Sequence, residues 1–244
     1  MGIIASTSEK KGDDRVDLLP MLLGKDNKIC IGGQQRICTA ICNPADKLSL
    51  PIGMTEGFRR LPNGKYAVKW VLLTPAVFPE ITASAEATPH PGGWLPGWIS
   101  AQDAPEKNLE KRQVALRDES KTKRKDREPR EVWRRRIKEL LPIRAHLVAA
   151  IVERPLVVTG WALANPDAGR QEGAKPTHLA VPAGAVYYFE ADTPEDAVAL
   201  AAALNWHGSD PNCNTIRNRR STLLGEKGFG IGVCGTWEFY SGPK

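Results

Sequence analysis

Long apolar runs, paired cysteines and nucleotide-binding signatures are all missing from this sequence of 244 residues. No stretch approaches the roughly 18 uninterrupted apolar residues of a membrane span, and residues 1–11 lack the charged-then-apolar order of a secretory signal. Hydrophobic (41%) and charged (25%) residues occur in ordinary globular proportions, which excludes collagen-like, coiled-coil and wholly disordered classes. We therefore expect a cytoplasmic protein without a membrane span.

Metal-ligand patterns are absent as well. The five cysteines form no CxxC pair, and Cys30, Cys38 and Cys42 are separated along the chain from Cys213 and Cys234. The four histidines are scattered, at His90, His146, His178 and His207. We expect reduced thiols in or near a core, with no metal and no cofactor.

The net charge of +6 comes from one segment. Residues 107–139 contain 14 Lys or Arg and 7 Asp or Glu, whereas the rest of the chain has 20 basic and 21 acidic residues. The densest stretch, KTKRKDREPREVWRRR (121–136), predicts two helical pieces around a break. Pro129 suits the first turn of the second piece, Trp133, Ile137 and Leu141 form an anchoring stripe, and Pro142 marks the stop.

Clustered cations can neutralise phosphates, so this segment indicates a surface for a polyanion. The candidate residues are Lys123, Arg124, Lys125, Arg134 and Arg135. The interleaved acids also allow a solvated helix with ion pairs along its own surface. The Pro- and Gly-rich approach HPGGWLPG (90–97) suggests that the segment is an insertion projecting from the main body, over about residues 88–142.

The rest of the chain is mainly strands. Two apolar runs flank Gly32-Gly33, and residues 65–78 place Tyr66, Val68, Trp70 and Leu72 on one face at period two. Further strands are expected within 146–158, within 179–190 with an interruption at 182–184, and over 231–240. The clearest helix has Thr193 as N-cap and continues to residue 204. We expect an α+β fold with an antiparallel sheet, a flexible N-terminus (1–14) and one domain over 15–240.

The C-terminal region is rich in glycine, in the stretch LGEKGFGIGVCGTW (224–237). It is not a Walker loop, since the G-x-x-x-x-G-K-[ST] order is absent, and it is not a dinucleotide fingerprint, since a strand should follow. Such a backbone can approach a phosphodiester and donate its N–H groups to phosphate oxygens. A glycine-rich bulge in a crowded sheet is the alternative.

These residues resemble a known family. GFGIGVCGTW (228–237) resembles the glycine-rich loop of RAMP proteins in CRISPR effector complexes. The stretch GWALANPDAGRQEGAKPTHLAVPAGAVYYFE (160–190) resembles more specifically the Cas-five-like subunits of the type III-B (Cmr) complex. ICIGGQQRICTAI (29–41) is similar to an earlier Gly-Gly strand pair of that family.

The resemblance implies a RAMP, ferredoxin-like (RRM-related) antiparallel sheet, into which the basic helical segment would be inserted. It also implies a non-catalytic role in antiviral defence, in which the chain binds the 5′ handle of CRISPR RNA and joins the large Cas-ten-type subunit to the RAMP backbone subunits. The family's first strand and helix are not recognisable here. We therefore expect a sheet that is incomplete at its N-terminal side, with an open edge that a partner covers. Either a separate chain supplies the missing N-terminal half or the domain is abbreviated.

The resemblance also assigns roles to residues. Its glycine loop corresponds to Gly228, Phe229, Gly230 and Gly232, with Lys227 supplying charge, and its strand pair to Gly32, Gly33 and Arg36. Arg217, Arg219 and Arg220 directly precede the glycine loop and are expected to contact phosphates, because a guanidinium matches phosphate oxygens.

Two other functions stay open. A metal-independent RAMP ribonuclease that processes CRISPR RNA would need a general base near a 2′-hydroxyl, and His207 and His178 are the candidates. A general RNA-binding protein would depend on the basic segment alone. The sequence contains no paired carboxylates, nucleophile elbow or metal-ligand cluster that would favour other hydrolases.

Overall fold

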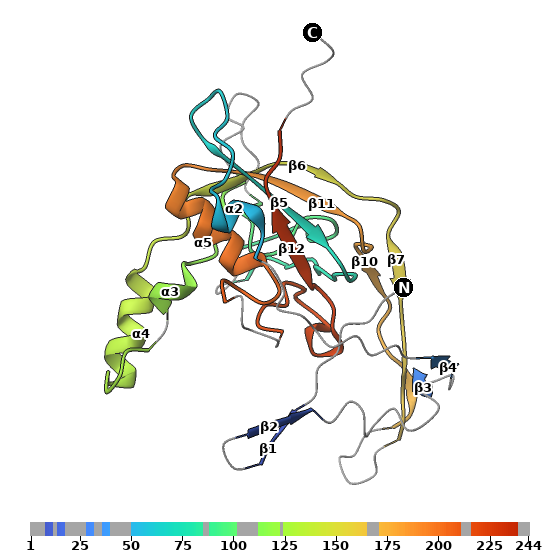
Figure 1. Cartoon of the computed structure of the whole chain (residues 1–244). Coiled ribbons are helices and arrows are strands. Elements are labelled where there is room, and N and C mark those ends of the chain that lie inside the picture. The colour runs from blue at the N-terminus through green and yellow to red at the C-terminus, as the bar shows by residue number, and fades with distance from the viewer. Residues whose placement is uncertain are drawn as a thin grey trace. The chain divides into compact units, whose positions relative to one another are not determined.

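The computed structural model describes residues 8–11, 14–17, 28–31, 36–39, 50–84, 88–101, 112–122, 124–164, 171–210 and 216–238 (Figure 1). The chain divides into two compact units, residues 1–49 with 211–215 and residues 50–210 with 216–244. The domain expected over 15–240 therefore spans both units.

The first unit contains two antiparallel strand pairs among its described residues. β1 (Ser8–Lys11) pairs with β2 (Asp14–Asp17), and β3 (Lys28–Ile31) pairs with β4 (Arg36–Thr39). The strand pair expected around Gly32-Gly33 is thus confirmed, although the two glycines themselves lie outside the described residues.

The second unit holds the remaining elements, which follow each other as α2 (Ile52–Thr55), β5 (Tyr66–Leu72), α3 (Glu119–Thr122), α4 (Arg130–Glu139), β6 (Ala145–Ile151), β7 (Leu156–Val158), β8 (Trp161–Ala162), β9 (Gly173–Ala174), β10 (His178–Ala180), β11 (Val186–Ala191), α5 (Pro194–Leu204), the 3-10 turn η3 (Gly225–Lys227) and β12 (Gly232–Gly235). The expected α+β class with antiparallel pairing is confirmed. Among the described residues, no helix has the length and apolar character that a bilayer crossing requires.

Four strands form the central sheet, in the order β12-β5-β11-β6, and every neighbouring pair is antiparallel. In chain order these are the fourth, first, third and second strands, which is the order of a ferredoxin-like split βαβ sheet. The expectation of a sheet that lacks its first strand is wrong for this sheet, because β5 takes that position.

Short segments cover part of each sheet edge. At the β6 edge, the backbone N–H of Val114 donates to Ala145 O (2.9 Å), and that of Leu147 donates to Arg112 O (3.0 Å). At the β12 edge, Trp206 N donates to Gly232 O (2.9 Å). The predicted open edge is therefore partly covered by the chain's own residues.

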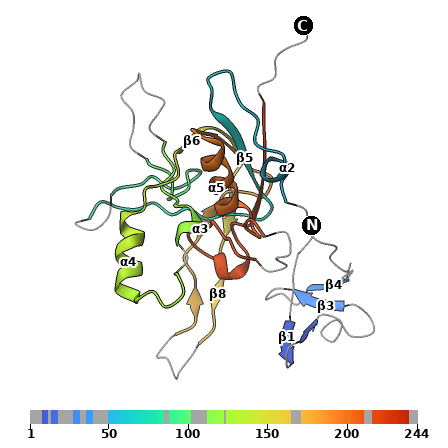
Figure 2. The ribbon, with the colours of Figure 1, turned by 60° about the vertical axis from the view of Figure 1, so that its left-hand side comes forward.

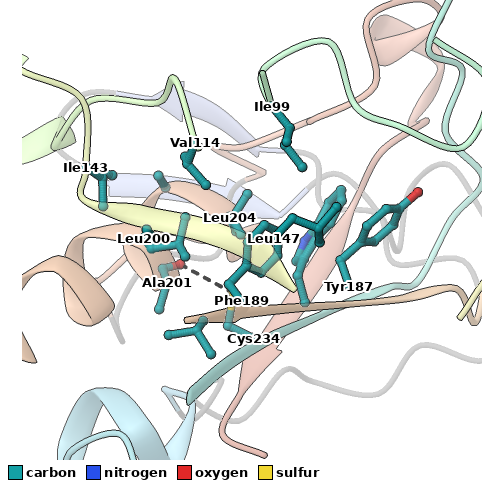
Figure 3. Packing of buried hydrophobic residues seen from close by; sticks show 14 of the residues in the cluster. Ile99, Val114, Ile143, Leu147, Tyr187, Phe189, Leu200, Ala201, Leu204 and Cys234 are labelled. Carbon is teal, nitrogen blue, oxygen red and sulfur yellow. Dashed lines mark hydrogen bonds between the residues drawn. The ribbon is translucent and has the colours of Figure 1, made fainter. Parts of the chain in front are cut away.

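Helix α5 packs on one face of the sheet and builds the core (Figure 3). Thr193 Oγ1 accepts a hydrogen bond from Asp196 N (3.1 Å) at the start of the helix, as its N-cap pattern predicted. Leu200 and Leu204 of α5 are fully buried in the same cluster as Trp70 and Phe189 of the sheet. Side chains at alternate positions of β5 face this core, as the period-two pattern predicted.

The connection between β5 and β6 holds the basic segment. Where a ferredoxin-like sheet has its first helix, the described residues of this connection form α3 and α4, and neither helix has a buried residue. Two helical pieces around a break are confirmed, but α4 ends at Glu139, before Pro142. Leu141 is 82% exposed, so the anchoring stripe stops at Ile137.

Candidate nucleic-acid interface

The loop between α5 and β12 is fixed to the end of α5. The last carbonyl groups of a helix have no donor within the helix and need other partners. Asn218 Nδ2 donates to Ala202 O and to Asn205 O (2.8 Å each), and Arg220 Nε donates to Ala203 O (2.6 Å). Two loop side chains therefore cap α5 and hold the loop beside the sheet.

Arg220 is occupied inside the protein. Its Nη2 donates to Glu119 Oε1 of α3 (2.7 Å), and its side chain is only 19% exposed. Burial lowers the pKa of the guanidinium and the Glu119 carboxylate opposes that effect, so Arg220 stays charged within an ion pair. In this conformation Arg220 links the loop to the basic segment and has no free fork to offer a phosphate.

The backbone of the glycine loop is occupied as well. The N–H groups of Lys227 and Phe229 donate to Leu224 O, and the N–H of Gly228 donates to Gly225 O. The N–H of Gly230 donates to Pro75 O (2.7 Å). The N–H groups of these four residues are therefore not free to donate to a phosphate, in contrast to the expectation from the sequence.

Internal packing explains two of the glycines. A Cβ at Gly230 would collide with the backbone nitrogen of Ser221, and one at Gly232 would collide with the indole nitrogen of Trp70. Gly228 differs, because it has a φ of +84° and open space around its Cβ position, with only an Ile231 methyl at 4.0 Å. Phe229, the remaining member of the loop, is partly buried.

Two cations on this turn remain available. Arg219 and Lys227 are exposed, and within the described part of the chain neither has an ion-pair partner. Arg219 lies against η3, since a Cβ at Gly225 would be 3.7 Å from Arg219 Cβ, and Lys227 ends η3. Arg217 is exposed but pairs with Asp210 (3.2 Å). The turn thus presents two exposed cations, Arg219 against the start of η3 and Lys227 at its end, together with the exposed carboxylate of Glu226.

The basic segment is a second cationic surface, and a partly buried ion pair between Arg136 and Glu128 holds it together. Arg136 makes two hydrogen bonds of 2.9 Å to the Glu128 carboxylate, and the hydrogen bond from Arg136 lowers the pKa of Glu128 to about 2. Trp133 Nε1 donates to Thr122 O (2.8 Å), which joins α4 to α3. The acids in this segment therefore neutralise part of its charge, in line with the solvated-helix alternative.

Other cations of the segment make no salt bridge among the described residues. These are Arg134 and Arg135 on α4 and Lys125 before it, all exposed. Lys125 nevertheless lies beside an acid, because its backbone N–H donates to Glu128 Oε2 (3.0 Å). Arg124 is also exposed, and its Nε donates to Glu128 O (2.7 Å). Lys123 lies outside the described residues. Figure 2 shows α4 standing away from the sheet, where a long polyanion has access to it.

Three predicted site residues, Gly32, Gly33 and Arg36, belong to the first unit. Arg36 is the first residue of β4, and Gly32 and Gly33 lie outside the described residues. Their contribution to RNA binding stays a prediction.

The two histidines offered for ribonuclease chemistry have different surroundings. His207 is buried, its Nδ1 has no hydrogen-bond partner among the described residues, and burial lowers the pKa of its ring. His178 lies on β10, paired with β7. A buried imidazole has no access to a 2′-hydroxyl in this conformation. No group of three or more potential metal ligands occurs in the part of the chain that the structure describes.

The chain was compared with known families, curated proteins and solved structures. A family model described as CRISPR-associated protein (Cas_Cmr3) matches residues 53–237, which begin in α2 and end just beyond β12. The chain therefore belongs to the Cas_Cmr3 family of CRISPR-associated proteins, the Cas-five-like subunits of the type III-B Cmr effector complex. No curated protein and no solved structure matched the chain.

Sequence reasoning missed the internal role of Asn218 and Arg220. The available signal was position, because both lie within 16 residues after a helix whose own C-terminal sequence, Ala-Leu-Asn, supplies no cationic cap. Position alone did not separate these residues from Arg219, which points to solvent.

Proposed function

We propose that this chain is the RNA-binding, non-catalytic RAMP subunit of a type III-B CRISPR effector complex. In this role it binds the 5′ handle of CRISPR RNA and joins the large Cas-ten-type subunit to the RAMP backbone subunits in antiviral defence. The strand order β12-β5-β11-β6, which RRM-related folds share, supports a RAMP-like domain.

The observation that carries this proposal concerns Arg219 and Lys227. Both are exposed cations without an ion-pair partner among the described residues, and both lie on a turn that is fixed to the sheet. An RNA strand carries one phosphate per nucleotide. Exposed cations without acidic partners favour its binding, because each phosphate contact releases the counterions condensed on the RNA. Arg219 adds a planar fork suited to phosphate oxygens. The turn is anchored by the hydrogen bond from Gly230 N to Pro75 O and by the two side chains that cap α5, so its backbone needs little ordering when RNA binds.

The test compares charge-matched double variants of the full chain. R219A/K227A removes two charges from the turn, R134A/R135A removes two from α4, and R60A/R154A removes two exposed charges elsewhere. We expect R219A/K227A to weaken binding to a single-stranded RNA with the repeat-derived 5′ end, and to reduce the slope of log K against log salt by about 0.7 per lost phosphate contact. R60A/R154A should bind as the unmodified chain does.

Purification of the tagged chain from its host tests the complex. RNAs that share one repeat-derived 5′ end, recovered with a large Cas-ten-type subunit, are the expected result. Heterogeneous RNA without those proteins, or equal affinity for a scrambled 5′ end, would contradict the proposal and favour a general RNA-binding protein. Cleavage of precursor RNA by the pure chain without metal would favour the ribonuclease alternative.

A further inference from the structure

An apolar hollow opens next to the C-terminal end of β6. It has a volume of about 460 Å³, which is within the range of small-molecule sites, and its lining includes Trp94, Ala150 and Val181. Among the described residues that line it, Glu153 alone carries a charge. We call this feature the Trp94 hollow.

The loop that carries Trp94 is closely fixed to the core. Gly92 and Gly93 precede it with φ values of +60° and +66°, and a Cβ at Gly92 would collide with the backbone of Pro79. The hydroxyl of Tyr187, which belongs to the buried cluster of Figure 3, donates to Trp94 O (2.7 Å). A backbone fixed in this way limits where the indole can go, so a ligand of Trp94 has little order to impose.

The exposure and charge around the indole favour a flat ligand that carries negative charge. Trp94 is 40% exposed, so part of its ring is available for stacking. The Arg112 guanidinium lies over the ring, 4.8 Å from its centroid, and has no ion-pair partner among the described residues. A cation at this place repels a cationic ligand and attracts a phosphate. A nucleotide combines an aromatic ring with a phosphate.

Glu153 gives the hollow a hydrogen-bond acceptor. The residue is exposed, and within the part of the chain that the structure describes it makes no salt bridge. An ionised carboxylate only accepts hydrogen bonds, so it selects ligand groups that donate. Guanine has a ring N–H and an amino group side by side on its Watson–Crick edge, whereas each other RNA base donates there from a single atom. Guanine is therefore the base that matches both carboxylate oxygens.

One segment of main chain, residues 75–78, joins the Trp94 hollow to the loop of exposed cations. On one side, Ala76 exchanges two backbone hydrogen bonds with Val181 of the hollow (2.9 and 2.8 Å). On the other side, Val77 O accepts from Thr222 N (3.0 Å). Paired strands are about 4.8 Å apart, so the backbones of Val181 and Thr222 are separated by about 10 Å. An RNA strand held by the loop can therefore place a nearby base in the hollow.

We propose that the Trp94 hollow binds one unpaired base of the RNA, stacked on the indole, with guanine preferred because it donates to Glu153. This inference rests on the proposed function, since the cations of the turn bind the RNA backbone and the hollow adds recognition of one base. Phosphate contacts carry no sequence information by themselves. A base site is what allows the chain to distinguish the 5′ handle from other single-stranded RNA.

The test removes each base in turn from a single-stranded RNA with the repeat-derived 5′ end. For the unmodified full chain, we expect one abasic position to weaken binding about fivefold or more, because the stacking of that base on an aromatic ring is lost. Trp94→Leu should weaken binding of the intact RNA to a similar extent and should make the chain insensitive to that abasic position, since both changes remove the same contact.

Two matched variants separate stacking from folding. Trp94→Phe keeps an aromatic ring and should retain most of the affinity that Trp94→Leu loses. Trp161→Leu changes a tryptophan that is 60% exposed on the β8 strand, and it should bind the RNA as the unmodified chain does. Circular dichroism and thermal unfolding of each variant show whether it folds.

Glu153→Gln tests the carboxylate. At the position identified by the abasic scan, the unmodified chain should prefer guanosine over inosine, which lacks the amino group, and this variant should lose that preference. In the unmodified chain, 6-thioguanosine at the same position should photo-crosslink to Trp94 or a neighbouring residue of the hollow. The crosslink does not depend on the folding of any variant.

The alternatives give different results. An abasic scan in which no position differs from the rest, or crosslinks confined to the 216–230 loop, would overturn the inference while the chain still binds RNA. Equal weakening of every abasic RNA by Trp94→Leu would overturn it as well, and so would free GMP that binds at Trp94 without competing with the RNA. If the unmodified chain does not bind the repeat-derived 5′ end in preference to a scrambled one, the proposed function fails instead.

Discussion

Arg219 and Arg220 are neighbours in the chain with opposite surroundings. Arg220 caps Ala203 O and pairs with Glu119, whereas Arg219 faces solvent. We expect Arg220→Ala to lower the free energy of unfolding by about 1–3 kcal/mol, because it leaves a helix-end carbonyl and a partly exposed carboxylate without their partner. Urea denaturation followed by tryptophan fluorescence measures this change.

Arg219→Ala is the matched control, and it should change stability by less than about 0.5 kcal/mol while it weakens RNA binding. Equal stability of the two variants would show that the Arg220 contacts contribute little. This split also matters for experiments that change Arg217, Arg219 and Arg220 together, because loss of RNA binding by that triple variant mixes lost contacts with a damaged loop.

Gly232 tests whether the glycine-rich end serves internal packing. A Cβ at this position would collide with the indole of Trp70 and lie 2.8 Å from Val71 O, and both neighbours are part of the sheet. We expect Gly232→Ala to lower the free energy of unfolding by about 1–3 kcal/mol through overpacking. Gly173→Ala, where no atom lies within 4 Å of the added Cβ, should be close to neutral in the same denaturation experiment. Equal effects would contradict the packing explanation.

At the scale of elements, the α3–α4 pair depends on the ionised Glu128. Its folded-state pKa of about 2 lies below the ordinary glutamate value of 4.5, so its stabilising effect is fully present above pH 4.5 and is lost as the pH falls through about 2. We therefore expect the NMR chemical shifts of Arg130–Glu139 to move toward random-coil values as the pH falls below about 3.

Glu128→Gln should weaken this dependence and fray α4 already at neutral pH, because an amide accepts from Arg136 without charge. Glu131→Gln, at an exposed position of the same helix, should leave the pH profile unchanged. A profile that is insensitive to Glu128→Gln would show that Trp133 and its bond to Thr122 suffice to hold the two helices together.

Elements determined by local signals were predictable from the sequence. Helix α5 has its N-cap, a proline at the first position and acids in the first turn within four residues, and β5 has a clear period of two. The end of α4 was not predictable from Pro142, because the backbone already turns to an extended conformation at Leu140, two residues before the proline. The last side chain of α4 that bonds the preceding loop in the described chain is Arg136, which binds Glu128 eight residues earlier. A proline limits how far a helix can extend and does not fix where it ends.

At the scale of the whole molecule, the strand order could not be obtained from the sequence. The sheet pairs β5 with β12, more than 150 residues away, and β11 with both β5 and β6. Because the first-helix position holds a long connection with short, exposed helices, β5 did not resemble the start of a ferredoxin-like unit. The sequence also could not show which arginine of the loop lacks an ion-pair partner. Arg220 pairs with Glu119, which is 101 residues earlier in the chain and comes close only in the folded structure.

The two cationic surfaces predict a dependence on RNA length. The turn with Arg219 and Lys227 is small and anchored, whereas α4 stands away from the sheet and presents Arg134 and Arg135. We expect R219A/K227A to weaken binding to a short handle oligonucleotide and to a handle followed by guide sequence. R134A/R135A should weaken binding to the longer RNA alone, because only that RNA reaches both surfaces.

Fluorescence anisotropy at several salt concentrations measures both effects, and the longer RNA should show the steeper salt dependence. If R134A/R135A abolishes binding to the short oligonucleotide as well, α4 is the primary site and the chain behaves as a general RNA-binding protein.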